Sequence, residues 1–295
     1  MAKILVTGAN GMLGSDLCEI FKEKGHQVIG TDLDNLDVCD FKTVQDTMIQ
    51  IEPDFVIHLA GMTDVDDCEK DPEKAFQINT IGTQHVALAC QKTRALLVYL
   101  STLSVFDGTK CEPYTEFDTP NPQSWYSRSK YRGELVVEKL LKQYYIVRAG
   151  WMFGGGLEDK KFVVKIMDLA LKNGSIDVVD DKYGSPTYTR DISSGIERLI
   201  NTGLYGTYHM VNTGGYCSRF EYAQAILKYA GIKTCAVHPV SSASFPLPAP
   251  RPRIEAARNY SLELHGWNWM PAWRNALEGY IKTVLLPERE TVARM

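Results

Sequence analysis

The sequence contains no Cys-x-x-Cys pair and no cluster of histidines, although it has seven cysteines and six histidines among its 295 residues. An odd number of cysteines at irregular spacing is typical of reduced, packed thiols rather than of disulfides or a zinc site. We therefore expect no bound metal. Long apolar runs are also missing, and none approaches the roughly 20 residues that a membrane-spanning helix needs.

A basic stripe is lacking as well, because 32 Lys and Arg residues stand against 36 Asp and Glu residues and the net charge is −4. This balance argues against nucleic acid as a partner. The chain begins Met1-Ala2-Lys3 and enters an apolar run at once, without the features of a secretory signal. These absences predict a cytoplasmic protein with no membrane partner. They leave the oligomeric state open, with a homodimer as one alternative.

Three glycines follow the first apolar run, Lys3 to Thr7, in the sequence Gly8-Ala9-Asn10-Gly11-Met12-Leu13-Gly14. Glycines at this spacing between a strand and a helix are typical of a turn that binds a dinucleotide, with its phosphates on the helix N-terminus. For the glycines alone, a tight turn without a ligand is the alternative. The residues of this loop expected to contact the cofactor are Gly8, Asn10, Gly11, Met12 and Leu13.

An aspartate supports the cofactor interpretation. Asp32 follows the second apolar run, Gln27 to Thr31, about 20 residues beyond the glycines. A carboxylate at this place accepts hydrogen bonds from the adenosine ribose and repels a 2′-phosphate. The sequence therefore predicts NADH as the preferred cofactor, with NADPH as the alternative.

Strand-like and helix-like segments alternate through the first half of the chain. The strand-like runs are 3–7, 27–31, 54–59, 95–101 and 144–149, and helical patterns begin near Met12, Phe41, Asp71 and Ser124. Short apolar strands separated by helices predict an α/β fold with a doubly wound parallel sheet of Rossmann type. The ligand of such a sheet binds at the carboxyl ends of the strands.

Glycine, serine and proline interrupt this alternation beyond about Gly150, as in Gly154-Gly155-Gly156 and in the segment 241–252. We predict a dinucleotide-binding domain over 1–150 and, over 151–295, mainly a smaller C-terminal substrate lobe, from which the chain can return to the first domain. From about Pro287 there are few apolar groups to bury, so we expect a frayed end.

Tyr126 and Lys130 form a Tyr-x-x-x-Lys pair after the fourth strand-like run. On a helix they share a face, so the lysine ammonium would lower the tyrosine pKa and suit it to protonating a carbonyl during hydride transfer. Thr102, at the preceding strand end, can bond the same oxygen or else satisfy a local backbone group. A second pair, Tyr229 and Lys233, lies at a predicted helix C-terminus, and we give it no role.

Taken together, these motifs resemble the extended short-chain dehydrogenase/reductases that act on nucleotide sugars, and within them the dTDP-4-dehydrorhamnose reductases. The resemblance runs from Lys3 to about Ile281. Besides the glycine loop and the Tyr126/Lys130 pair, it rests on Leu36-Asp37-Val38, Pro53-Asp54-Phe55-Val56-Ile57-His58, Val65-Asp66-x-Cys68-Glu69, Ile78-Asn79, Ser101-Thr102, Arg148-x-x-Trp151, Gly184-Ser185-Pro186-Thr187 and Arg251-Pro252.

The resemblance implies an NADH-dependent reductase that converts a nucleotide-linked 4-keto-6-deoxy sugar to the alcohol. Its implied catalytic residues are Thr102, Tyr126 and Lys130. Further implied cofactor contacts are Asp37 and Val38 at the adenine, Leu59, Ala60 and Gly61 along the cofactor, and Tyr126 and Lys130, with Lys130 on the nicotinamide ribose.

On the substrate side the implied contacts are Thr102, Ser104, Trp151 and Arg251. Arg251 would clamp the nucleotide diphosphate with its forked donors, and a lone surface arginine is the alternative. The resemblance leaves Asn79 either structural or linked to the cofactor.

Two departures from the family pattern concern the sugar. Leu103-Ser104 stand where the family has Asp-Tyr, and residues 253–257 lack the family's usual serine. We expect a site with fewer polar partners, which discriminates less among sugars. The first change also argues against nucleotide-sugar 4,6-dehydratases, which need an Asp-Glu pair after the threonine. Two alternatives to the reductase remain, an epimerase that keeps NAD bound and a non-catalytic, reductase-like regulatory subunit.

Overall fold

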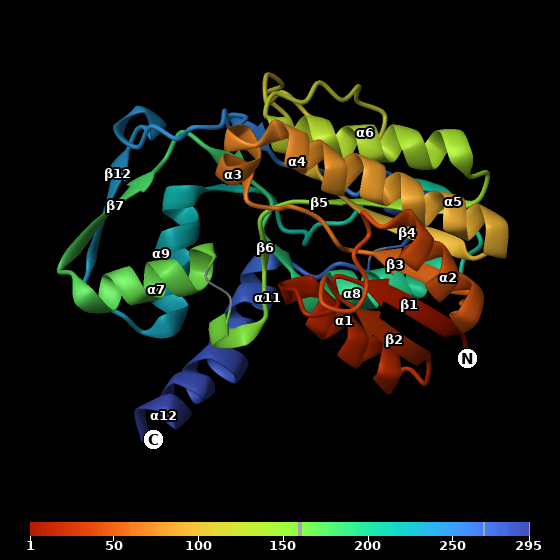
Figure 1. Ribbon diagram of the computed structural model, residues 1–295. Coiled ribbons are helices and arrows are strands. Elements are labelled where there is room, and N and C mark those ends of the chain that lie inside the picture. The colour runs from red at the N-terminus through yellow and green to blue at the C-terminus, as the bar shows by residue number, and fades with distance from the viewer. Residues whose placement is uncertain (159–160, 268, 295) are drawn as a thin grey trace.

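The computed structural model describes residues 1–158, 161–267 and 269–294. Among these residues, the central sheet has six parallel strands in the order β10-β5-β4-β3-β1-β2, and a smaller lobe lies beside it (Figure 1). The strands of the sheet are β1 Lys3–Thr7, β2 Gln27–Thr31, β3 Phe55–His58, β4 Leu96–Thr102, β5 Tyr144–Ala149 and β10 Gly206–His209.

Helices cover both faces of this sheet, because successive strand side chains point to opposite faces and both sets are apolar. Ile4 belongs to the core under α1 and α8, whereas its neighbour Leu5 belongs to the core under α2, α5 and α6. The bounds of these helices are α1 Met12–Glu23, α8 Thr189–Ile200, α2 Phe41–Ile51, α5 Thr83–Thr93 and α6 Trp125–Leu140. The predicted doubly wound parallel sheet is confirmed.

Capping residues determine where two of these helices begin. The side chain of Asp40 accepts hydrogen bonds from the backbone nitrogens of Lys42 and Thr43 at the start of α2. Ser124 and Ser127 form a capping box at the start of α6. Each such cap contributes about 1 kcal/mol and fixes the first turn of its helix. In α6 that turn carries Tyr126.

After β5 the chain leaves the central sheet and later returns to it. Strand β10 pairs with β5, and α8 packs on α1. The sequence analysis missed β10 because Gly-Thr-Tyr-His at 206–209 contains no apolar run. This strand forms one edge of the sheet.

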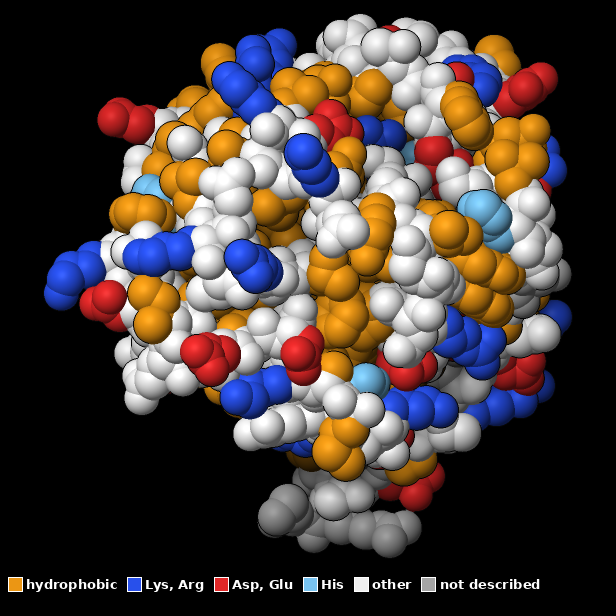
Figure 2. Space-filling view, turned by 90° about the vertical axis from the view of Figure 1, so that its right-hand side faces the viewer, with side chains coloured by type: hydrophobic (Ala, Val, Ile, Leu, Met, Phe, Trp, Pro, Cys, Tyr) orange, Lys and Arg blue, Asp and Glu red, His pale blue; other side chains and the backbone are white. Residues whose placement is uncertain are grey.

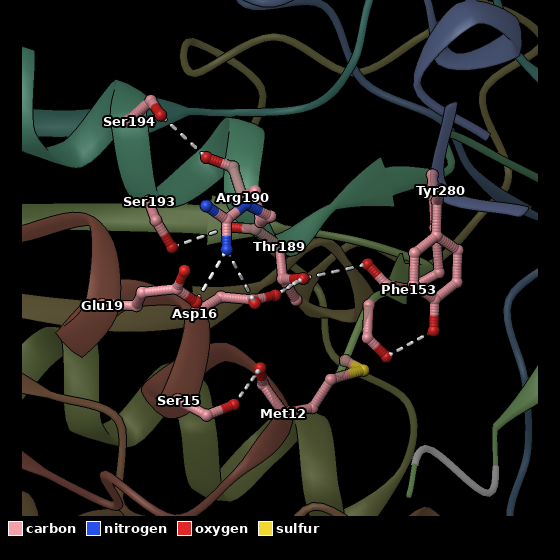
Figure 3. Close-up of polar contacts among 11 residues, drawn as sticks. Met12, Ser15, Asp16, Glu19, Phe153, Thr189, Arg190, Ser193, Ser194 and Tyr280 are labelled. Carbon is pink, nitrogen blue, oxygen red and sulfur yellow. Dashed lines mark hydrogen bonds and ion pairs between the residues drawn. The ribbon is translucent and has the colours of Figure 1, made fainter. Parts of the chain in front are cut away.

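A charged contact holds α8 against α1. Arg190 points between two carboxylates of α1, with its Nη1 2.8 Å from Glu19 Oε2 and 3.7 Å from Asp16 Oδ1 (Figure 3). Thr189 donates a hydrogen bond to the same Asp16. Burial raises the pKa of Asp16, and the bonds from Thr189 and Arg190 oppose that rise. The contact ties the returning segment to the helix that follows the glycine loop.

The smaller lobe has its own apolar core, which includes Phe153, Tyr222 and Trp273. Its longer elements are α7 Phe162–Lys172, β7 Ser175–Val179, α9 Arg219–Ala230, β12 Ala236–Val240, α11 Trp273–Tyr280 and α12 Leu286–Arg294. Its short strands are β6 Met152–Phe153, β8 Tyr183–Gly184, β9 Thr187–Tyr188, β11 Cys217–Ser218 and β13 Ile254–Glu255, while the short helices α3 Val65–Lys70, α4 Pro72–Phe76 and α10 Tyr260–Leu264 pack on elements of the central sheet's layers.

The expectation of a frayed end from Pro287 is wrong for the described residues. They form α12, in which Glu288 accepts a hydrogen bond from the backbone nitrogen of Leu157 at 2.8 Å and Arg289 pairs with Asp168. Polar contacts therefore hold a segment that has few apolar groups.

Charges of both signs are interspersed with apolar side chains on the face of the molecule that Figure 2 shows. Every helix among the described residues falls short of the length and apolar character that a bilayer span requires.

Candidate active site

The loop between β1 and α1 forms one wall of a large cavity. Gly8 has a φ of 70°, and a Cβ on it would lie 2.8 Å from the Ala60 backbone nitrogen. A Cβ on Gly14 would overlap the carbonyl oxygen of Gly8. Glycine at these positions therefore permits the tight turn and the close packing of the helix on it. Gly11 is the N-cap of α1 and has no side chain to bond the first N–H groups, which leaves them to an anion.

This cavity has a volume of about 850 Å³, within the range of pockets that hold small-molecule ligands. The predicted cofactor residues that line it are Gly8, Asn10, Gly11, Met12, Leu13, Asp32, Asp37, Val38, Leu59, Ala60 and Gly61. Lys74 of α4 lines it too, as do Met152 and Lys161 from beyond β5. The sequence analysis missed these three residues, because only tertiary packing brings them to the cavity.

Asp32 lies at the end of β2 and at the edge of the cavity. Its Oδ2 accepts a hydrogen bond from Asn10 N at 2.9 Å, and its Oδ1 accepts one from Leu33 N at 2.8 Å. Each carboxylate oxygen can accept a further bond. Asp32 is therefore tied to the glycine loop while its negative charge borders the cavity.

Asn79 connects the cavity to α6. Its Oδ1 accepts from Met62 N at 2.8 Å, and its Nδ2 donates to Met62 O at 3.0 Å and to Ser129 Oγ at 2.9 Å. A Cβ on Gly61 would lie 2.9 Å from Asn79 Oδ1 and 3.9 Å from Lys130 Nζ. These bonds favour the structural alternative for Asn79, since they hold the loop at 61–62 against the helix that carries Lys130.

The structure brings Thr102, Tyr126 and Lys130 together at the carboxyl end of β4. Tyr126 and Lys130 lie one turn apart on α6. The side chain of Thr102, the last residue of β4, is hydrogen-bonded to the Tyr126 phenol, and its Oγ1 also accepts from Ser104 N at 3.1 Å. The Nζ atom of Lys130 lies 4.2 Å from the ring centroid of Tyr99.

The expectation that Lys130 lowers the pKa of Tyr126 is wrong. Burial raises the pKa of Tyr126 to about 12, and the nearby Glu255 adds to the rise while the bond with Thr102 opposes it. Burial also lowers the pKa of Lys130 to about 7, with Glu134 opposing. Tyr126 is consequently a protonated phenol at neutral pH, and this form can donate a proton.

Ser104 and Trp151 meet at a carboxylate that the sequence analysis missed. Glu255 of β13 accepts hydrogen bonds from Ser104 Oγ and, at 3.0 Å, from Trp151 Nε1. Trp151 has a φ of 42°, which is uncommon for a bulky residue, and Arg219 stacks 3.5 Å from its ring centroid. A Cβ on Gly184 would overlap the indole on this side of the site. The sequence did contain one indication of Glu255, because it lies in the segment 253–257, where the family's usual serine is lacking.

Leu103 does not lie in the sugar site, although the family resemblance places a polar sugar-site residue at this position. It is 1% exposed and packs in a core with Phe106 and Val211. The expectation of a site poor in polar partners must therefore be revised, because Glu255 brings a carboxylate to the position beside Ser104.

Arg251 lies in an ion pair between the two lobes. Its Nη2 is 2.9 Å from Asp66 Oδ2 of α3, and its Nη1 donates to Ala249 O at 2.9 Å. Asp66 Oδ1 also accepts from Ala249 N at 3.1 Å. The guanidinium thus holds the proline-rich segment onto α3, and a role on the nucleotide diphosphate stays a prediction.

Comparisons with known proteins agree with this geometry. A family model described as the RmlD substrate binding domain matches residues 2–286. The spore coat polysaccharide biosynthesis protein SpsK of Bacillus subtilis is 35% identical over 282 residues, which cover 96% of this chain and 98% of that protein. A dTDP-4-dehydrorhamnose reductase of Mycobacterium tuberculosis is 36% identical over 279 residues, or 93% of this chain and 91% of that protein.

A solved structure is similar over nearly the same extent. The dTDP-4-dehydrorhamnose reductase of Bacillus anthracis in complex with NADP is 41% identical, with a TM-score of 0.90 over 94% of this chain and 97% of that chain. These matches confirm the resemblance that the motifs carry. The chain belongs to the RmlD substrate binding domain family, alongside dTDP-4-dehydrorhamnose reductases.

Proposed function

We propose that this protein is an NAD(P)H-dependent reductase of a nucleotide-linked 4-keto-6-deoxy sugar, acting as a dTDP-4-dehydrorhamnose reductase does in dTDP-rhamnose biosynthesis. The observation that carries the proposal is the position of Thr102, Tyr126 and Lys130, which the last residue of β4 and the first turns of α6 bring together next to the glycine-loop cavity. The dinucleotide-type cavity and the family of the chain support it.

When bound in the cavity, the reduced nicotinamide supplies the hydride. Tyr126 holds the proton that the sugar keto oxygen takes up, and Thr102 orients that phenol. Lys130 approaches the cavity behind Gly61, where its ammonium form can bond a ribose hydroxyl. The N–H groups at the start of α1 bind the pyrophosphate.

We assign the preference for NADH over NADPH to Asp32. Its carboxylate is anchored to Asn10 N and Leu33 N, so that it borders the cavity as a fixed negative charge. A 2′-phosphate at the same place would meet like charge. The NADP in the Bacillus anthracis structure belongs to that protein, and direct competition of the two cofactors tests the assignment here.

The protein is also proposed to work in a reducing compartment, the cytoplasm. All seven of its cysteines are free, four of them buried, and disulfides are rare where thiols are kept reduced.

The test is a panel of nucleotide-linked 4-keto sugars followed by the loss of NADH or NADPH absorbance. A reductase oxidises one cofactor for each alcohol formed. Sugar conversion without net loss of NADH would support the epimerase instead. Cofactor binding without turnover of any sugar would support the regulatory subunit.

A further inference from the structure

We propose that Glu255 binds the substrate and recognises the sugar hydroxyl next to the keto carbon. The proposal rests on the proposed reductase function and deepens it by naming a residue that determines which sugars are accepted. Glu255 belongs to β13 of the smaller lobe, and its carboxylate contacts both Ser104, which follows β4, and Trp151, which follows β5.

The position of the Glu255 carboxylate is fixed from several sides. One oxygen accepts from Ser104 Oγ, and the other accepts from Trp151 Nε1 at 3.0 Å. Its backbone is paired in register with Gly184 of β8, where the absence of a side chain leaves room for the indole. Residues held in this way present a preorganised acceptor to a ligand, which lowers the entropic cost of binding.

The Glu255 carboxylate can accept further hydrogen bonds. A carboxylate offers about four lone-pair positions, of which the bonds from Ser104 and Trp151 use two. It has no hydrogen of its own to donate when ionised. It can therefore bind hydroxyl or ammonium groups of a substrate, which donate hydrogen bonds.

A short chain of bonds joins Glu255 to the reacting centre. Tyr126 is bonded to Thr102, Thr102 Oγ1 accepts from Ser104 N, and Ser104 Oγ donates to Glu255. The charge of Glu255 also reaches Tyr126, since it contributes to the raised pKa of the phenol. Because Ser104 joins Glu255 to Thr102, we expect a substituent on a carbon adjacent to the keto carbon to reach Glu255 when Thr102 and Tyr126 hold the keto oxygen.

In a 4-keto-6-deoxy sugar one neighbour of the keto carbon bears a hydroxyl and the other bears the methyl group. The hydroxyl is the donor that Glu255 can bind, whereas the methyl side offers none. Selectivity in this site thus comes from acceptor positions of the Glu255 carboxylate that stay unfilled when a sugar without the hydroxyl binds.

The experiment compares two substrates in the wild type, in Glu255→Gln and in Glu255→Ala. One substrate is a dTDP-linked 4-keto-6-deoxyhexose with its 3-hydroxyl, and the other is the 3-deoxy analogue. We expect the wild type to favour the hydroxylated sugar in kcat/KM by about 10- to 100-fold, as for a hydrogen bond to a charged group. The preference should shrink to about threefold or less in Glu255→Ala and to an intermediate value in Glu255→Gln, while NADH affinity is unchanged.

A matched control is Glu263→Gln. Glu263 is an exposed carboxylate that pairs with Arg258 at 2.5 Å, away from the cavity, so its neutralisation should leave the substrate preference intact. Glu255→Gln keeps the shape of the side chain and remains informative if Glu255→Ala folds poorly.

Two failures are distinguishable. If the wild type reduces these sugars and both variants keep the full preference, Glu255 does not read the hydroxyl and the inference is overturned while the reductase stands. If the wild type reduces no nucleotide-linked 4-keto sugar, the proposed function is overturned and the inference falls with it.

Discussion

The cofactor side and the substrate side of this site are built in different ways. The cofactor side consists of turns at the ends of neighbouring strands, with residues 8–13 after β1, 32–38 after β2 and 59–61 after β3. On the substrate side, Ser104 and Glu255 are bonded although 151 positions separate them. The first kind of site can be recognised from local patterns, whereas the second exists only when the two lobes meet.

The two sides also rely on different groups. The cofactor side combines the backbone of the glycine loop with side chains that follow directly along the chain, such as Asp32. The proposed substrate side presents the side chains of Ser104, Trp151 and Glu255, with Ser104 and Trp151 each donating a hydrogen bond to Glu255. We therefore expect a single substitution there to change which sugars the site accepts, as happens among functions that share one fold.

The largest expected effect is at Tyr126, the proposed proton donor. Tyr126→Phe removes the proton donor and keeps the ring, so turnover should fall about 10²- to 10⁴-fold while NADH affinity is retained. The measurement is single-turnover loss of NADH absorbance. The control is Tyr229→Phe, in the second Tyr-x-x-x-Lys pair near the C-terminus of α9, which should leave turnover unchanged. A loss of less than tenfold would remove Tyr126 from the donor role.

Lys130 comes next, because we propose that it binds the cofactor from the helix that carries Tyr126. Lys130→Met should weaken NADH binding and turnover together by about 10- to 100-fold, the range for bonds to a charged group. With a pKa of about 7, the lysine is charged below that pH and loses its charge above it. We therefore expect kcat/KM to fall as pH rises through about 7. Exposed Lys139 on the same helix supplies the control, Lys139→Met, and a flat profile would contradict the assignment.

Asp32 tests the cofactor side alone. Asp32→Ala should lower the affinity for NADH about tenfold, because it removes the acceptor for the ribose hydroxyls. It should also reduce the difference in affinity between NADH and NADPH, because it removes the charge that repels a 2′-phosphate. Sugar selectivity should not change. Asp34→Ala, at an exposed neighbour, is the control. If the wild type already prefers NADPH by tenfold or more, Asp32 does not set the preference.

The smallest expected effect is at Arg251, on the substrate side. Its pair with Asp66 is partly exposed, and such pairs are worth at most about 1 kcal/mol. Arg251→Ala should raise the KM for the nucleotide sugar about threefold without altering NADH affinity, and Arg253→Ala should alter neither. An unchanged KM in Arg251→Ala would leave the arginine as a link between the lobes only.

Particular residues show how far sequence reasoning reached. The bounds of β1, β2 and β5 agree with the predicted runs, since each is a short apolar segment closed by a polar or turn residue. The glycine loop and Asp32 were placed correctly at the cavity, because strand, turn and helix are contiguous in the chain. Strand β10 was missed because it has no apolar run of its own. It is a strand because it pairs with β5.

The sequence by itself determined the parallel sheet, the cavity at the ends of its strands and the helix that carries Tyr126 and Lys130. Those features depend on periodicity and on short-range turns and caps. Only the tertiary structure decided that Leu103 is a core residue, that Arg251 pairs with Asp66 and that Glu255 reaches Ser104 and Trp151. Burial and long-range pairing depend on neighbours far away in the chain, so the raised pKa of Tyr126 and the position of the Glu255 carboxylate follow from packing.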